Sequence, residues 1–124
     1  TTSLPSIPSA RNRERAALAR RVVDALTPLG PVRAQAMFGG HGIFLEDLML
    51  GLTLDDQLWL KADDLNRSLY CDAGSHCFVY RRMGKPVELG FWCVLPEIWA
   101  DPHDLIAWAE SAFAAAKRTK AGKR

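Results

Sequence analysis

The sequence predicts an α+β fold in which a helix, an antiparallel β-meander of about five to six strands and a closing helix follow one another. Apolar residues recur every three or four positions near both ends, and every second position between residues 32 and 94. Short runs of Gly, Pro and Asp separate the alternating segments. With 124 residues, 48% of them hydrophobic, the chain fits one domain with its own core. We expect a flexible arm over residues 1–9, the domain over 10–116 and a basic tail over 117–124.

A first helix is expected from its N-cap, Ser9, to about Thr27, because its apolar residues form one stripe. Pro28, Gly30 and Pro31 end this helix. The stripe consists of Leu18, Val22, Ala25, Leu26 and Leu29, and the remaining surface carries Arg11, Arg13, Arg15, Arg20 and Arg21.

The alternating segments predict strands joined by short turns. The run Gly39-Gly40-His41-Gly42 forms the first expected turn, because glycine adopts positive φ without strain. Glu46-Asp47 and residues 55–57 form the next two. Within 48–54, four leucines are expected on one face, at positions 48, 50, 52 and 54. The expected strands are 32–38, one that starts at 43–45, 48–54 and 58–61.

The second half predicts a short helix, a hairpin and a long helix. The short helix is expected over 63–70, and the hairpin over 78–82 and 87–94, joined through 84–86. Asp101 caps the final helix and Pro102 takes its first position. Its apolar stripe is Leu105, Ala109, Ala112, Phe113 and Ala116, after which the basic tail is expected to fray.

Charge and cysteine content narrow the class of protein. Residues 117–124 hold five of the 16 basic residues and no acid, so the rest has 11 basic and 14 acidic residues, a net charge of −3. A basic tail on an acidic body is weak evidence for a nucleic-acid partner. Three cysteines do not suggest a disulfide framework, and neither a signal sequence nor a membrane-length apolar run is visible. We therefore expect a cytoplasmic protein that does not bind membranes.

The sequence offers no convincing catalytic or metal site. Cys71, His76 and Cys77 lack the closely paired spacing of structural zinc ligands, and Cys93 lies in an apolar strand as a core residue. No histidine is placed beside a nucleophile with a third group to orient it. The glycine run joins two strands and lacks the lysine and hydroxyl residue of a phosphate loop. We expect no enzyme, no metal and no cofactor.

Interaction surfaces are the remaining candidates. Trp99, in the 96–99 linker, suits a protein interface. Two sheet edges favour a homodimer, although Arg81, Arg82 and Lys85 would oppose it at one edge. The residues available to contact phosphates in the tail are Lys117, Arg118, Lys120, Lys123 and Arg124.

Three motifs in order resemble the TfoX N-terminal domains of the TfoX/Sxy competence-regulator family. Residues 37–45, MFGGHGIFL, resemble M-F-G-G-x-G-[IL]-[FY], a lysine follows the strand 58–60, and residues 80–87 resemble Y-x-R-x-G-K-P-V. The resemblance covers about residues 15–117. Its family positions here are Met37, Phe38, Gly39, Gly40, Gly42, Lys61, Tyr80, Arg81, Gly84 and Lys85.

The resemblance implies a secretion-chaperone-like α-β(5)-α fold and a role in regulating natural competence through partner proteins. The resemblance also implies that full-length competence regulators carry a further helical C-terminal domain, and we expect this chain to act without one. We favour a regulatory or adaptor domain acting by protein–protein contact. The alternatives are a weak, sequence-independent nucleic-acid binder that uses the tail and the first-helix arginines, and a small enzyme.

Overall fold

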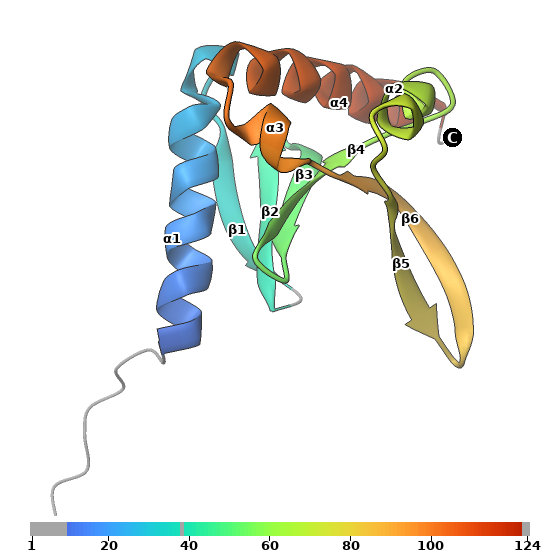
Figure 1. Cartoon of the computed structure of the whole chain (residues 1–124), viewed down its shortest axis with the longest axis horizontal. Coiled ribbons are helices and arrows are strands. Elements are labelled where there is room, and N and C mark those ends of the chain that lie inside the picture. Colours follow the sequence, from blue (N-terminus) through green and yellow to red (C-terminus); the bar gives the residue numbers. More distant parts are fainter. Residues whose placement is uncertain (1–9, 38, 123–124) are drawn as a thin grey trace, which may run out of the picture.

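The chain folds as a helix, an antiparallel sheet and C-terminal helices, which confirms the expected α+β class. A computed structural model describes residues 10–37 and 39–122 (Figure 1). Its first half comprises α1 (Ala10–Ala25), the 3₁₀ turn η1 (Thr27–Leu29), β1 (Arg33–Met37), β2 (Gly40–Leu45), β3 (Leu48–Leu54) and β4 (Gln57–Lys61). Its second half comprises α2 (Arg67–Asp72), β5 (Cys77–Arg82), β6 (Lys85–Cys93), α3 (Pro96–Trp99) and α4 (Pro102–Gly122).

The strand order departs from a simple meander at the last hairpin. Over the described residues the sheet has six strands in the order β1-β2-β3-β4-β6-β5, and every neighbouring pair is antiparallel. After β4, the connection through α2 leads to β5, which does not pair with β4. The next strand, β6, lies between β4 and β5 and pairs with both. The strand β5 is therefore left at the edge of the sheet (Figure 1).

Three hairpins close through two-residue turns with positive φ at both central residues. These residues are Glu46-Asp47 (φ 52° and 64°), Asp55-Asp56 (54° and 63°) and Met83-Gly84 (53° and 80°). This is the type I′ geometry, whose twist matches that of the flanking strands. The expected turns at 55–57 and 84–86 were therefore too long, because Gln57, Lys85 and Pro86 already belong to strands.

The glycine run is only partly a turn. Gly39 has a φ of 76°, which confirms the expectation that one of these glycines adopts positive φ. Gly40 and Gly42 instead lie inside β2, where neighbouring atoms leave no room for a side chain. A Cβ on Gly40 would lie 1.9 Å from the carbonyl oxygen of Thr53, and one on Gly42 would lie 2.8 Å from the Phe44 ring.

A β-bulge in β3 divides its leucines between the two faces of the sheet. Ile43 pairs with Gly51 and Phe44 with Met49, so Leu50 is an extra residue. As a result, Leu50 enters the main core, whereas Leu52 and Leu54 point to the opposite face. The expectation that all four leucines share one face was wrong, because simple alternation assumes an uninterrupted strand.

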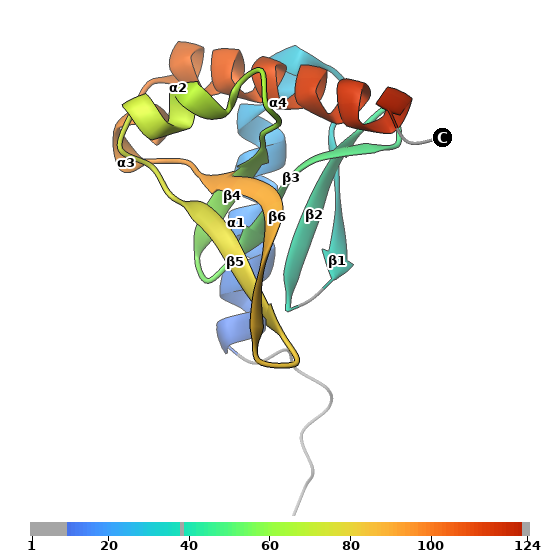
Figure 2. The same cartoon turned by 90° about the vertical axis from the view of Figure 1, so that its right-hand side faces the viewer.

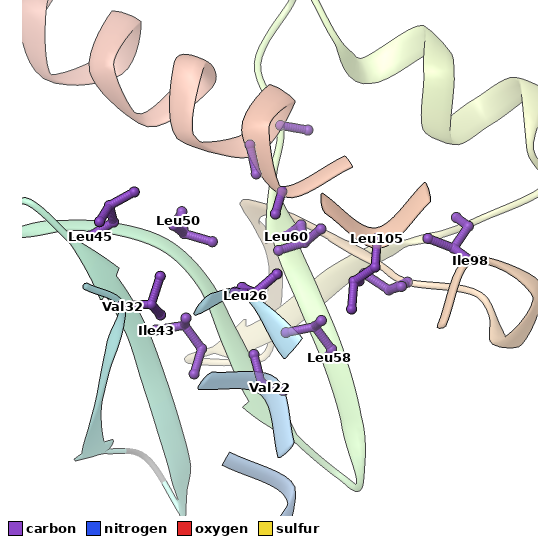
Figure 3. Close-up of a cluster of buried hydrophobic side chains, with 14 of the residues drawn as sticks. Val22, Leu26, Val32, Ile43, Leu45, Leu50, Leu58, Leu60, Ile98 and Leu105 are labelled. Carbon is purple, nitrogen blue, oxygen red and sulfur yellow. The ribbon is translucent and has the colours of Figure 1, made fainter. Parts of the chain in front are cut away.

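The main core lies between the sheet and the helices α1 and α4 (Figures 1 and 3). Both expected apolar stripes face this core, and alanines allow α4 to approach the strands closely. Residues contributed by the strands and the 26–32 segment include Leu26, Val32, Ile43, Leu45, Leu50, Leu58 and Leu60. The helices contribute Val22, Ile98, Leu105, Ala109 and Ala112.

A second apolar cluster forms on the other face of the sheet without any helix. Trp59 lies at its centre, 6% exposed, with Leu52, Phe91 and Cys93 around it. The Trp59 ring meets the rings of Phe78 (5.1 Å) and His76 (5.4 Å) edge-on. Its indole N–H donates to the carbonyl oxygen of Leu54 at 3.2 Å.

The short helix begins four residues later than expected, because residues 63–66 form a side-chain-capped turn. One carboxylate oxygen of Asp63 accepts the backbone N–H groups of Leu65 (3.1 Å) and Asn66 (3.3 Å), and the Asn66 carbonyl Oδ1 accepts from the N–H of Asp63 (2.7 Å). Such local bonds compete with helix formation. The buried Asn66 Nδ2 also donates to Ser111 Oγ at 3.0 Å, which ties this turn to α4.

The basic tail does not fray at residue 117, because α4 continues to Gly122. The Arg118 guanidinium donates to both carboxylate oxygens of Asp63, at 2.6 and 2.9 Å. The ammonium group of Lys117 lies 4.5 Å from the centre of the Phe113 ring. Lys123 and Arg124 lie outside the described residues. Likewise, the 96–99 segment expected as a linker is the helix α3.

Gly40→Ala is expected to destabilise the protein more than Gly39→Ala. Clash with the Thr53 carbonyl forces backbone displacement, at a cost of about 1–3 kcal/mol or more. At Gly39 the nearest atom to an added Cβ would be a side-chain nitrogen of Arg15, 4.0 Å away, so alanine there costs only the strain of positive φ, about 1–2 kcal/mol. Urea denaturation measures both, with Gly74→Ala (φ 83°, nothing within 4 Å) as the control for φ strain alone. Equal losses at Gly40 and Gly74 would contradict the clash.

The Asp63–Arg118 pair should make stability depend on acid pH. The Arg118 hydrogen bonds, with help from two backbone N–H groups, lower the pKa of Asp63 from 3.8 to about 2. Because the folded value is the lower one, the stabilisation is complete above about pH 4 and disappears as the pH falls toward 2. Asp63→Asn should therefore be less stable than the parent at pH 7 and nearly equal to it at pH 2, as measured by urea denaturation. Asp64→Asn, at a carboxylate that is 90% exposed, is the matched control. A constant deficit from pH 7 to pH 2 would rule out this origin.

Candidate interaction surfaces

The family-motif positions gather in two places in the fold. Met37, Gly39, Gly40 and Gly42 lie where β1 meets β2, and close packing accounts for the last two. The other described positions lie on the β5–β6 hairpin or at its base. They are Lys61, Tyr80, Arg81, Gly84 and Lys85, whereas Phe38 lies outside the described residues.

The outer part of this hairpin, residues 79–90, extends beyond the rest of the sheet, and we call it the hairpin arm (Figures 1 and 2). β6 pairs with β4 only at Phe91–Cys93, so the arm is a two-stranded ribbon. Gly90, with a φ of 75°, and a register shift between Cys77 and Val79 mark its base. The ammonium group of Lys61 lies 5.1 Å from the centre of the Phe91 ring there.

The tip of the arm carries basic side chains around one exposed methionine. Arg81, Arg82 and Lys85 are exposed, and Met83 is 94% exposed at the first position of the turn. Arg81 makes a long hydrogen bond, 3.4 Å, to the carbonyl oxygen of Gly84. Counted from Tyr80, the arginine of the family motif falls on Arg82, so the earlier assignment to Arg81 was one residue early.

A second surface surrounds Trp99 on α3. Trp99 is half-buried, with one part packed on the main core and the Arg21 guanidinium 5.1 Å from its ring centre. Beside it lies a cavity of about 380 Å³, which we call the Trp99 cavity. Its lining is Arg21, Asp56, Gln57, Cys93, Val94, Pro96, Trp99 and Ala100.

The three cysteines lie on three different elements and differ in burial. Burial raises the pKa of the Cys93 thiol, which donates to Gln57 Oε1 at 2.8 Å, while Cys71 is exposed on α2 and Cys77 is half-buried on β5. Among the residues that the structure describes, no three His, Cys, Asp or Glu side chains come together as metal ligands. The expected core role of Cys93 agrees with its 5% exposure.

A cavity beside α1 has a lining that does not suggest catalysis. It has a volume of about 530 Å³ and separates the first half of α1 from the β3–β4 turn. Arg11, Glu14 and Arg15 face Asp55 and Asp56 across it, so charges of both signs line it. Its described lining includes no histidine, cysteine or serine that could form a nucleophile–base pair.

Tyr70 is the most deeply buried titratable residue that sequence reasoning missed. Its ring packs edge-on against Trp108, at 4.7 Å between ring centres, and its hydroxyl has no hydrogen-bond partner among the described residues. Burial raises the pKa of this hydroxyl. This ring contact places Tyr70 of α2 in the packing against α4.

Comparison with known proteins identifies the family to which this arrangement belongs. The family model of the TfoX N-terminal domain matches residues 24–116, three quarters of the chain. The chain belongs to the TfoX N-terminal domain family. Protein Sxy of Escherichia coli (strain K12) is 21% identical over 97 residues, which cover 78% of this chain and 46% of Sxy. The chain thus spans about half the length of this curated relative.

The family match contains the hairpin arm and Trp99 but excludes most of the two other basic segments. The five arginines of α1 lie before residue 24, and Lys117, Arg118 and Lys120 lie after residue 116. Sequence reasoning missed the contributions of Met83, Gly90 and the Trp99 cavity. Of these three, only Met83 could have been singled out from the sequence, because it is a large apolar residue directly before a glycine in a turn. Within the described residues, no helix is long and apolar enough to span a membrane.

Proposed function

We propose that this domain is a non-enzymatic regulatory adaptor that acts in transcriptional control of the competence type by binding a protein partner through the Trp99 surface. Membership of the TfoX N-terminal domain family supports the regulatory class. The observation that carries the choice of surface is the stacking of Arg21 over Trp99 beside an open cavity. Tryptophan and arginine are the residue types most enriched among those that dominate binding energy.

The Trp99 surface, formed by Trp99 and the other residues that line the Trp99 cavity, combines an apolar side chain held in place by the core with polar residues at its edge. Trp99 packs against the main core, which restricts its side chain before any partner binds. Binding therefore costs little additional side-chain entropy. Pro96 and Val94 add apolar area, and Asp56 and Gln57 supply a polar rim. Such a recess suits an apolar anchor residue from a partner, with hydrogen bonds around it.

The alternative function, nucleic-acid binding through the basic tail, is less well supported because two of the tail's basic side chains already have partners within the protein. Arg118 is committed to Asp63 through two charge-assisted hydrogen bonds, and Lys117 lies over Phe113. A phosphate would have to displace these intramolecular contacts. Cytoplasmic location is part of the proposal, since a reducing compartment suits a chain with only three cysteines.

The proposal is tested by affinity capture from the source cell with mass spectrometry. Arg21→Glu, which removes the cation over Trp99 without entering the core, should reduce capture of the specific partner several-fold. Arg20→Glu is the matched control, because it makes the same charge change at the next exposed position of α1. Equal capture by the parent and both variants would argue against the Trp99 surface.

Homodimerisation remains a prediction, proposed from the sheet edge at β1, since Arg81 and Arg82 oppose pairing of two copies along the edge at β5. Static light scattering over a concentration series should give a mass that rises toward twice the chain mass of 13.8 kDa. A constant 13.8 kDa at high concentration would exclude the dimer.

A further inference from the structure

We propose that the hairpin arm binds duplex DNA, with Arg81, Arg82 and Lys85 on the phosphates and Met83 against the bases of a groove. This binding site goes beyond the adaptor function and uses a different surface. It also differs from the alternative that relies on the tail and the first-helix arginines.

The first argument is the shape of the arm. Residues 85–88 of β6 pair with β5 alone, so the ribbon is free of the sheet over about 13 Å, at 3.3 Å per residue. At Gly90 the chain is already tied to the sheet, because its carbonyl oxygen accepts the backbone N–H of Ala62 at 2.8 Å. A two-stranded ribbon is narrow enough to enter a groove of B-DNA. Figures 1 and 2 show its tip at the outer end of the molecule, away from α4.

The second argument is charge. The arm has three basic residues and one acidic residue, Glu88, a net charge of +2 in twelve residues against a mildly acidic body. All three basic side chains are exposed at the tip, within two residues of the turn. Phosphate contacts from such side chains provide most of the affinity in sequence-independent binding.

The third argument is the residue at the apex. Met83 has a φ of 53°, a conformation that methionine adopts at a cost and that asparagine or glycine adopts more easily. Backbone geometry therefore does not explain a methionine there. An apolar side chain that is 94% exposed between cationic neighbours fits a wedge that contacts bases, as in proteins that bend DNA from a groove.

The fourth argument concerns the edges of the ribbon. Arg82 and Lys85 form the hydrogen-bonded closing pair, so the backbone of the next pair, Arg81 and Pro86, points outward. Pro86 has no N–H to offer there, and it lies on the part of β6 that β4 does not cover. The arm is therefore poorly suited to accept another strand on this side, which favours a groove over an extended peptide as its binding site.

The test compares three variants that each remove two positive charges. These are Arg82→Gln/Lys85→Gln on the arm, Arg11→Gln/Arg20→Gln on α1 and Lys117→Gln/Lys120→Gln on α4. Binding to a fluorescent mixed-sequence DNA duplex is measured by anisotropy over a salt series. The arm variant should bind several-fold more weakly, and its slope of log affinity against log salt should fall by about 1.8, or 0.9 for each lost phosphate contact. The other two variants should bind nearly as the parent does.

Met83→Asn tests the contribution of the apolar side chain apart from that of the charges. Asparagine suits the positive φ at this position, so the turn and its basic neighbours are kept. It should weaken binding while leaving the salt slope unchanged. An RNA duplex, whose major groove is too deep and narrow for side chains to reach the bases, should bind more weakly than DNA.

Several results would overturn the proposal: no binding to the duplex at low salt, equal losses in all three charge variants, or equal affinity for DNA and RNA. If the arm variant bound DNA normally but captured less of a protein partner, the arm would be a protein-docking element instead. Failure of DNA binding would leave the Trp99 adaptor function untouched, since Arg21 is unchanged in every variant.

Discussion

The sheet must bury apolar side chains on both faces, and in the part of the chain that the structure describes, helices cover one face only. Leu58 and Leu60 point into the main core under α1 and α4, while Trp59 between them points the other way. Trp59 on that second face is buried by side chains of the same sheet and the segment before β5, through its contacts with Phe78 and His76. Removing each square ångström of apolar surface from water contributes about 25 cal/mol, so burial of this second face adds to the stability of the folded sheet.

This constraint also accounts for the position of the hairpin arm. Phe78 must stay near Trp59, and Phe91 must stay in the second cluster, which fixes the base of both β5 and β6. Beyond that base, the register shift and Gly90 let the ribbon leave the sheet. A surface available for contact thus arises from the packing of a few aromatic residues at its root.

The sequence allowed prediction of the elements whose signals are local. The stripes of α1 and α4, the capping of α4 by Asp101, and the turns at Glu46-Asp47 and Asp55-Asp56 depend on near neighbours in the chain. What could not be predicted depends on distant residues. The bulge at Leu50 is a mismatch between two strands, and α4 extends past residue 117 partly because Arg118 reaches Asp63, 55 positions away.

The candidate surfaces also divide into features with a local sequence signal and features that depend on contacts between distant residues. Trp99 could be singled out from its composition and context, but the Trp99 cavity brings Arg21, Gln57 and Cys93 together from separate elements. The motif positions were known from their resemblance to the family, yet only the fold separates the glycines, which pack, from the arm residues, which project. The start of α2 was misjudged because Asp63 reads equally well as a helix cap or as the first residue of a turn.

The proline on the outer edge of β6 has a consequence for the protein in concentrated solution. Projecting ribbons are prone to stack edge to edge into extended assemblies, because each exposed N–H and C=O can recruit another chain. Pro86 interrupts that row on one side, and the charges of Arg81 and Arg82 repel an identical ribbon on the other. The arm can therefore remain exposed without becoming a seed for aggregation.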